Sequence, residues 1–356
     1  MRHTTTGSVT WMVVCAALVA GGCSDDEAET TAAGPSATST SSQSTGGSGG
    51  AGGMQTGGAP PALEVLASFD AATGELPEGL ALRDDNAYVG FATLGAVVSV
   101  STMGGEPASY AQATGLPADN VFLTGLTFDA QGQLYAAVPS FVMNPAPGVY
   151  RAPAGGGDAT LFATDAAMFF PSGLEFDAQG SLYVSDSASG AVFRVSSTGS
   201  VEIFVQDPLL AGDKTICGND DALFDIGANG IAVTSSDVFV ANTDQATIVR
   251  IPIESSGAAG TPVVFAGPDC ATLGGIDGIA RASDGSFYAA LNRQNRIAKI
   301  SPQGQVTVAL EDPLFDFPAS VSLSQAEDAL FITNFALENA LGGQPANPAL
   351  LRWQLP

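Results

Sequence analysis

Histidine is almost absent from this chain of 356 residues, and that absence excludes several kinds of chemistry. The one histidine, His3, lies in an expected signal peptide and would be removed with it. A mature chain without imidazole cannot use Ser-His-Asp or Cys-His catalysis, and it cannot hold zinc or haem through histidine. Any hydrolysis would then depend on a cation and a carboxylate.

Basic residues are also scarce. The chain has 11 Lys and Arg against 36 Asp and Glu, which gives a formal net charge of −25. An acidic surface disfavours nucleic acid and anionic membrane surfaces as partners, and it attracts cations. We expect a monomer that contacts a membrane only through a lipid anchor.

Long apolar runs are missing except near the start, where residues 9–20 are apolar and are followed by Gly-Gly-Cys23. This pattern predicts a lipoprotein signal peptide over residues 1–22, with Cys23 as the lipidated first residue of the mature chain. The apolar stretch is short for a membrane span, so a retained transmembrane anchor is the alternative. We therefore expect a secreted chain anchored to the bacterial cell envelope, periplasmic or at the cell surface.

Two segments follow the signal peptide. Residues 23–61 are rich in Ser, Thr and Gly without periodic apolar residues, which predicts a flexible tether. Residues 62–356 have the composition of a folded domain. Only Cys217 and Cys270 fall within that domain, and in an oxidising compartment they are expected to form a disulfide.

One short pattern recurs six times in the domain, five times around a glycine and once around a serine. Its copies are Pro77-Glu78-Gly79-Leu80, Leu123-Thr124-Gly125-Leu126, Pro171-Ser172-Gly173-Leu174, Ala228-Asn229-Gly230-Ile231, Ile276-Asp277-Gly278-Ile279 and Pro318-Ala319-Ser320-Val321. The spacings of 46, 48, 57, 48 and 42 residues indicate an array of similar supersecondary units.

Each unit contains four short runs rich in β-branched and aromatic residues, separated by Gly, Asp and Ser turns, as residues 173–205 illustrate. This pattern predicts four-stranded antiparallel meanders, and six of them predict an all-β six-bladed β-propeller. The last unit ends after its third strand. Residues 63–69 resemble a fourth strand, so the N-terminal strand is expected to join the last blade and close the ring.

The residue before the glycine varies, and this position is expected to form a ring at one mouth of the central channel. First strands lie innermost in a propeller and run in the same direction, so equivalent positions meet. The ring consists of Glu78, Thr124, Ser172, Asn229, Asp277 and Ala319, and the turns after the second strands add Asp186, Asn242 and Asn292. Such oxygen-bearing side chains favour Ca²⁺ or Mg²⁺/Mn²⁺. The alternative is that these are solvated turn residues.

Three of these segments, Glu78-Gly79, Asn229-Gly230 and Asp277-Gly278, resemble those of the regucalcin/gluconolactonase family. That family consists of six-bladed propellers similar to the strictosidine-synthase group. The resemblance implies that Glu78, Asn229 and Asp277 bind a divalent cation, usually calcium. A further family Asn falls on Ser172, whose shorter side chain departs from the pattern.

The resemblance and the missing histidine together predict a cation-dependent lactonase or esterase. The cation would polarise a carbonyl or phosphoryl oxygen and lower the pKa of water, and Asp277 would also serve as the base. The expected substrate is a small lactone, related ester or carbohydrate, contacted by Thr124, Ser172, Asp186, Asn242 and Asn292. Two alternatives remain: a non-catalytic propeller that binds a glycan, peptide or protein, and a calcium-stabilised structural module.

Overall fold

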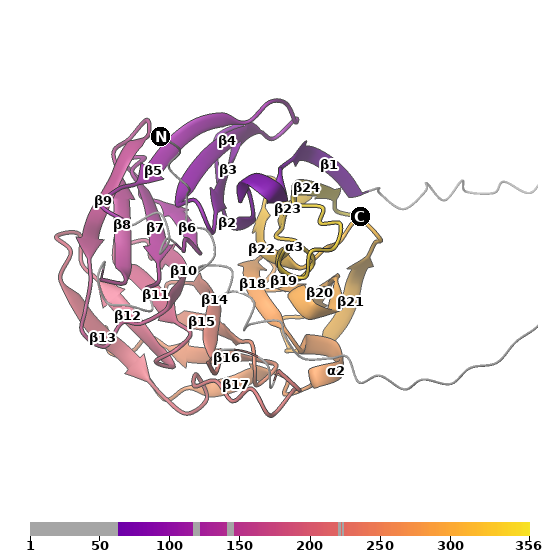
Figure 1. Cartoon of the computed structure of the whole chain (residues 1–356). Helices are drawn as coiled ribbons and strands as arrows, with labels where there is room; N and C mark the ends of the chain where they lie inside the picture. Colours follow the sequence, from indigo (N-terminus) through magenta and orange to yellow (C-terminus); the bar gives the residue numbers. More distant parts are fainter. Residues whose placement is uncertain (1–62, 117–121, 141–145, 220–221, 223) are drawn as a thin grey trace, which may run out of the picture.

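Twenty-four strands surround a central axis in the part of the chain that the structure describes (Figure 1). The structure is a computed structural model that describes residues 63–116, 122–140, 146–219, 222 and 224–356. The predicted signal peptide, Cys23 and the predicted tether lie outside these ranges. Within them, no helix has the length and apolar character needed to cross a membrane.

The strands form four-stranded antiparallel meanders that follow one another along the chain. They are β2 (Pro77–Arg83), β3 (Asn86–Phe91), β4 (Ala96–Ser101) and β5 (Ala108–Ala113); β6 (Leu126–Phe128), β7 (Leu134–Val138), β8 (Gly148–Ala152) and β9 (Gly157–Ala163); β10 (Pro171–Phe176), β11 (Leu182–Asp186), β12 (Ala191–Val195) and β13 (Val201–Gln206); β14 (Ala228–Val233), β15 (Asp237–Asn242), β16 (Thr247–Pro252) and β17 (Val263–Ala266); β18 (Ile276–Arg281), β19 (Phe287–Leu291), β20 (Arg296–Ile300) and β21 (Val306–Glu311); and β22 (Pro318–Leu323), β23 (Ala329–Asn334) and β24 (Ala349–Gln354) with β1 (Leu63–Ser68).

The all-β propeller class is confirmed, but the sheets do not number six. Four sheets have four strands each, and a fifth sheet has eight strands because the meanders β2–β5 and β6–β9 are joined. Their outer strands β5 and β9 pair in parallel from Ala111↔Gly157 to Ala113↔Ala159. Gly156 and Gly157 have positive φ angles of 94° and 109°, and a side chain at Gly156 would clash with the carbonyl oxygen of Tyr110. These glycines therefore allow the close approach.

The N-terminal strand closes the ring, as the sequence predicts. β1 pairs antiparallel with β24, from Leu63↔Trp353 to Ser68↔Ala349, so the two ends of the described domain share one sheet (Figure 1). Leu63 and Ala67 are buried in two different apolar clusters, one on each side of this sheet. The closure removes an exposed strand edge and completes both clusters.

Apolar clusters between neighbouring sheets make up the core. The second strands β7, β11 and β19 are buried at every position, because a sheet covers each of their faces. Tyr135 of β7, for example, packs in one cluster with Leu182 and Phe193 of the next sheet. Outer strands such as β13 are largely exposed. The unbroken apolar runs of the second strands reflect burial on both faces.

Five inner strands approach each other at the repeated glycines. A Cβ atom on Gly278 would lie 2.7 Å from the carbonyl oxygen of Ala319, and one on Gly173 would lie 2.8 Å from that of Asn229. The equivalent additions at Gly79, Gly125 and Gly230 would clash with the carbonyl oxygens of Thr124, Ser172 and Asp277. In each case the opposing carbonyl belongs to the ring residue of the next unit. Glycine is therefore required because only glycine leaves room for this contact.

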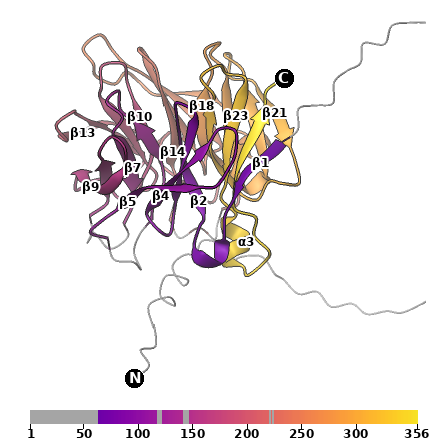
Figure 2. The ribbon, with the colours of Figure 1, turned by 90° about the horizontal axis from the view of Figure 1, so that it is seen from above.

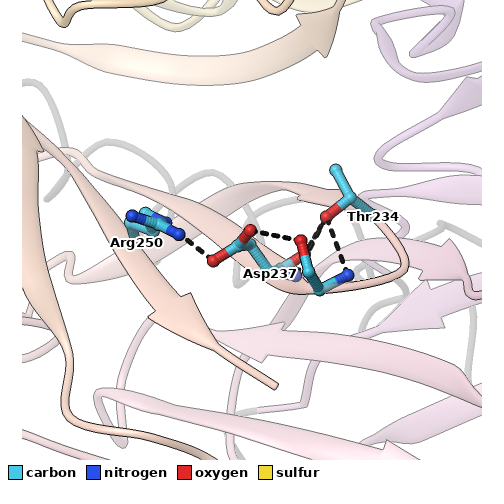
Figure 3. Close-up of polar contacts among 4 residues, drawn as sticks. Thr234, Asp237 and Arg250 are labelled. Carbon is cyan, nitrogen blue, oxygen red and sulfur yellow. Dashed lines mark hydrogen bonds and ion pairs between the residues drawn. The ribbon is translucent and has the colours of Figure 1, made fainter. Parts of the chain in front are cut away.

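A polar cluster at the C-terminal end of β14, opposite the end that carries Asn229, stabilises the turn to β15 (Figure 3). The backbone N–H of Asp237 donates to Thr234 Oγ1 at 2.9 Å, and Arg250 Nε lies 2.6 Å from Asp237 Oδ1. Figure 3 shows Arg250 reaching Asp237 from the neighbouring strand. These contacts stabilise the hairpin away from the end of β14 that carries Asn229.

Short helices and long connections gather at one face of the propeller. Figure 2 shows α3 (Leu337–Leu341) below the sheets on this face, beside the short 3-10 helix η1 (Ala71–Thr73). On the connection between β13 and β14, Cys217 forms a disulfide with Cys270 at the start of α2 (Cys270–Leu273), with 5.4 Å between the Cα atoms. The predicted disulfide is thus confirmed, and it joins two neighbouring units.

The glycine contacts make a first prediction. Gly125→Ala should lower the free energy of unfolding by about 1–3 kcal/mol, because the added methyl group meets the carbonyl oxygen of Ser172 in a packed inner strand. Denaturant unfolding measures this change. Ser320→Gly is the control, because the sixth unit already carries a side chain there, and its cost should stay within about 1 kcal/mol. Equal effects of the two substitutions would contradict the steric requirement.

Candidate functional site

Five of the six ring residues line one cavity at the mouth of the channel. The cavity has a volume of about 100 Å³, and its lining includes Glu78, Thr124, Ser172, Asn229 and Asp277. Ala319, the sixth ring residue, is fully buried. A larger cavity of about 440 Å³ at the opposite end of the channel is lined mostly by small and apolar residues. The smaller cavity is the candidate site because the reactive side chains meet there.

Local irregularities in the strands aim the ring residues into the mouth. In β10, β14 and β18 the pairing register shifts between the first residue and the fourth, so Ser172, Asn229 and Asp277 each lie within a bulge. The register of β2 also shifts around Glu78. Bulges of this kind redirect side chains and are common next to active sites. The same shift occurs in β22 between Pro318 and Val321, around Ala319 and Ser320, so it does not depend on the glycine.

Two buried carboxylates line the mouth and lie near enough for their charges to interact. Glu78 is 8% exposed and Asp277 is 7% exposed. Burial, with the neighbouring charge of Asp277 as the second cause, raises the pKa of Glu78 well above its ordinary value. Burial also raises the pKa of Asp277 to about 7, although hydrogen bonds from Asn292 and Asn229 oppose the shift. Among the described residues, Glu78 Oε2 has no hydrogen-bond partner.

Amide and hydroxyl groups orient the remaining site residues. Asn292 Nδ2 donates to Asp277 Oδ2 at 3.1 Å, and Ser172 Oγ donates to Asn229 Oδ1 at 2.8 Å. Asn229 Nδ2 donates to Thr243 Oγ1 at 3.1 Å, and Thr243 donates in turn to the carbonyl oxygen of Ile276, next to Asp277. The network connects three units and fixes the Asn229 side chain, whose amide nitrogen contacts Thr243 and Asp277 and whose amide oxygen accepts from Ser172.

The donor set fits a hard divalent cation. Glu78, Asp277 and Asn229 offer only oxygen, which suits Ca²⁺, Mg²⁺ or Mn²⁺ rather than zinc or copper. An unpaired buried carboxylate oxygen is costly, and a cation would compensate both carboxylates at once. No group of three or more His, Cys, Asp or Glu side chains converges anywhere in the described ranges. A cation here would therefore also need the Asn229 amide and water.

The structure separates the other expected substrate contacts into two groups. Thr124 and Asn292 line the cavity, although the Thr124 hydroxyl already donates to the carbonyl oxygen of Pro171 at 2.9 Å. Asp186 and Asn242 do not line it. Asp186 Oδ2 accepts two backbone N–H groups at 2.8 Å, those of Phe169 and Phe170.

The side chain of Asn242 likewise forms its hydrogen bonds with backbone groups. Its Nδ2 donates to the carbonyl oxygens of Leu209 and Ala211 at 3.0 and 2.8 Å, and its Oδ1 accepts from Gln245 N. Asp186 and Asn242 therefore both bind the backbone of loops, although the sequence predicts that they contact substrate. Their positions are equivalent to that of Asn292, but only Asn292 points into the mouth.

Apolar residues line much of the same cavity and were missed by sequence reasoning. They are Phe122, Phe170, Ala222, Phe224, Ile226, Phe317 and Leu337. A usable signal was present, because Phe122, Phe170 and Phe317 each stand two positions before a ring residue. Arg293 and Glu338 also contribute to the lining. The site thus combines a polar floor with apolar walls.

Comparisons with known proteins show which family and which folds the chain resembles. The family described as SMP-30/Gluconolactonase/LRE-like region matches residues 224–336, a stretch that includes Asn229 and Asp277 but not Glu78. The resemblance to the regucalcin and gluconolactonase family is thereby confirmed. None of the curated proteins matches the chain.

Solved structures with the same fold include two from this family. A gluconolactonase from Xanthomonas campestris is 18% identical, covering 84% of this chain and 98% of that one, with a TM-score of 0.58. A calcium-binding protein, regucalcin, from Agrobacterium tumefaciens is 16% identical, covering 83% and 94%, with a TM-score of 0.60. A virginiamycin B lyase from Staphylococcus aureus is 12% identical, covering 83% and 99%, with a TM-score of 0.53. At these identities the likeness concerns the fold.

The paired carboxylates predict a pH dependence of stability. In the metal-free protein the raised pKa values of Glu78 and Asp277 mean that the folded state binds more protons than the unfolded chain between about pH 4 and pH 7. The free energy of unfolding should therefore fall as the pH rises through this window. Denaturant unfolding in EDTA at several pH values measures the fall, and Asp277→Asn should reduce it.

Added calcium distinguishes the pH dependence caused by Glu78 and Asp277 from that caused by another buried carboxyl group, Glu175. Glu175, in the channel wall at the opposite end, also has a pKa raised to about 7 by burial, against the opposing effects of the Val233 N–H and Arg281. Saturating calcium should abolish the part due to Glu78 and Asp277, whereas Glu175→Gln should remove the separate part due to Glu175. An identical pH profile with and without calcium would contradict the paired-carboxylate site.

Proposed function

We propose that this propeller is a divalent-cation-dependent hydrolase of lactones or related esters, with its active site at the channel mouth. The observation that carries the proposal is the pair of buried carboxylates, Glu78 and Asp277, one of which leaves an oxygen without a partner beside the amide of Asn229. Such a costly arrangement is typical of a site that binds a cation and performs chemistry.

Glu78, Asn229 and Asp277 would hold the cation, and calcium is the first candidate. When bound, the cation would polarise the substrate carbonyl and lower the pKa of water. The other contributions come from side chains. Asn292 donates to Asp277 Oδ2 and so orients the carboxylate that would accept a proton. Ser172 fixes the direction of the Asn229 amide oxygen.

The proposed reaction consumes one water molecule. The water oxygen attacks the carbonyl carbon, and Asp277 accepts the proton that leaves. The bond between the carbonyl carbon and the ring or ester oxygen then breaks, and the departing oxygen takes the proton from Asp277. A lactone gives a hydroxy acid, and an open ester gives an acid and an alcohol. Asp277 is regenerated at the end of the cycle.

The known proteins support the proposal through their stated properties. The matching family is named for gluconolactonase, and one similar structure is described as a calcium-binding regucalcin. The family match includes the segments of Asn229 and Asp277, to which two of the three proposed ligands belong. The absence of histidine from residues 4–356 is compatible with a mechanism that uses only a cation and a carboxylate.

We also propose that the hydrolase acts at the bacterial cell envelope as a lipid-anchored monomer. The support is the sequence pattern that ends in Cys23, the expected tether over residues 23–61, and the Cys217–Cys270 disulfide, which suits an oxidising compartment. The acidic charge disfavours nucleic acid and anionic lipid as partners, so the lipid on Cys23 would be the contact with the membrane.

Calcium binding and turnover can be tested together. The full-length protein is melted in EDTA and in calcium, and hydrolysis of a lactone and ester panel is followed in both conditions. Calcium should raise the melting temperature, because it binds only the folded site. Asp277→Asn should lower kcat/KM by about 100-fold or more, because it removes both the base and a ligand charge.

Glu175→Gln is the matched control, because it changes a buried carboxyl group in the same channel, away from the candidate site, and keeps an acceptor for Val233 N. Its turnover and calcium shift should equal those of the wild type. The absence of a calcium shift in the wild type would refute the cation site. A shift without turnover would leave a calcium-stabilised module, or a propeller that binds a glycan, peptide or protein.

A further inference from the structure

Aromatic side chains from four separate segments form the walls above the carboxylates. The rings of Phe122 and Phe170 lie 5.9 Å apart between centroids, and those of Phe170 and Phe224 lie 4.9 Å apart. Phe317 and Leu337 complete the lining on another side. Phe170, Phe317 and Leu337 also join an apolar cluster that includes Phe122, Leu76 and Phe335, so the walls continue into the core.

The backbone is held in a costly conformation to present one of these rings. Phe317 has a φ angle of 55°, in the left-handed region that bulky residues rarely adopt. Its N–H donates to Asn295 Oδ1 at 2.6 Å, which stabilises this conformation. Strained residues of this kind tend to occur at functional sites.

Asp186 positions Phe170, as Asn295 positions Phe317. Its carboxylate accepts the N–H groups of Phe169 and Phe170, and it also accepts the N–H of Ser189. The loop before β10 is therefore fixed at the point where the Phe170 ring enters the cavity. Both Phe170 and Phe317 are thus placed by specific polar contacts.

Apolar side chains predominate in the walls, although Asn219, Arg293 and Glu338 also line the cavity. The hydroxyls of Thr124, Ser187 and Thr243 all donate to backbone carbonyl oxygens within the protein. Each sugar hydroxyl buried without a partner would cost binding energy. An alkyl or aryl group would instead gain by leaving water for the phenylalanine surface.

We propose that the substrate of this site is a small lactone or ester with an apolar substituent, and this inference rests on the proposed hydrolase function. The carbonyl lies over Glu78 and Asp277, and the substituent lies between Phe122, Phe170 and Leu337. The volume of about 100 Å³ is below the 300–1,000 Å³ typical of drug-sized ligands, so the substituent is short or extends towards solvent.

A series of inert analogues tests the apolar pocket separately from catalysis. Binding of 2-alkylcyclopentanones, from methyl to hexyl, to the calcium-loaded full-length protein is measured by calorimetry. Affinity should rise by about fourfold for each methylene group until the pocket is full. In parallel, kcat/KM is measured for the matching alkyl γ-lactones and for glucono-1,5-lactone, and the alkyl lactones should be preferred.

Substitutions of phenylalanines test whether the alkyl group binds against the cavity walls. Phe170→Ala should weaken binding of the best analogue by about tenfold. Phe317→Gly gives a second variant that removes a wall ring while suiting the positive φ angle, so its folding is favoured. Phe169→Ala is the matched control, because Phe169 neighbours Phe170, is 45% exposed and does not line the cavity. Its affinities should equal those of the wild type.

The outcomes separate the two proposals. Chain-length-dependent binding without hydrolysis of any lactone would support the apolar pocket and refute the hydrolase. Hydrolysis with a preference for glucono-1,5-lactone, or affinities that do not change with chain length, would overturn the apolar substrate and leave the hydrolase standing. Equal losses in Phe169→Ala and Phe170→Ala would also overturn the assignment of the pocket.

Discussion

The contact between the glycine of one inner strand and the carbonyl oxygen of the next is the constraint on which this structure depends. At five of six junctions there is no room for a side chain on that glycine, so the inner strands surround a narrow channel. The residue before each glycine is consequently forced to the mouth, where a bulge aims it inward. Packing between the sheets and the pairing of β1 with β24 keep the ring closed. The site is thus a consequence of how the units meet, and no single unit contains it.

Convergence at a narrow mouth has an electrostatic cost. Glu78 and Asp277 come from strands almost 200 residues apart, and the ring brings two carboxylates into one buried volume, which raises the pKa of each. Ser172, Asn229 and Asn292 arrange neutral oxygens and N–H groups around them, but Glu78 Oε2 stays without a partner in the described part of the molecule. A cation would relieve this cost. The aromatic walls would then exclude water and strengthen the interaction of the cation with the carboxylates.

Much of this arrangement follows from the sequence because it repeats. The spacing of the glycines predicts the strands and the closure by residues 63–69, and the ring positions predict that Glu78, Asn229 and Asp277 meet. Other features depend on contacts that no repeat encodes. The β5–β9 pairing depends on the positive φ angles of Gly156 and Gly157, and Asp186 and Asn242 find backbone partners in loops of unequal length. Three of the four wall phenylalanines stand two positions before a ring residue, a signal that becomes meaningful only when the ring is placed.

Anomalous X-ray diffraction from crystals grown with manganese tests the central claim most directly, because it locates a bound cation without reference to activity. The account predicts one strong anomalous peak at the mouth, within about 2.0–2.6 Å of carboxylate oxygens of Glu78 and Asp277 and of the amide oxygen of Asn229. It also predicts that this peak disappears in crystals of Glu78→Gln. A mouth without a peak under saturating manganese, or a peak that survives the substitution, would contradict the account.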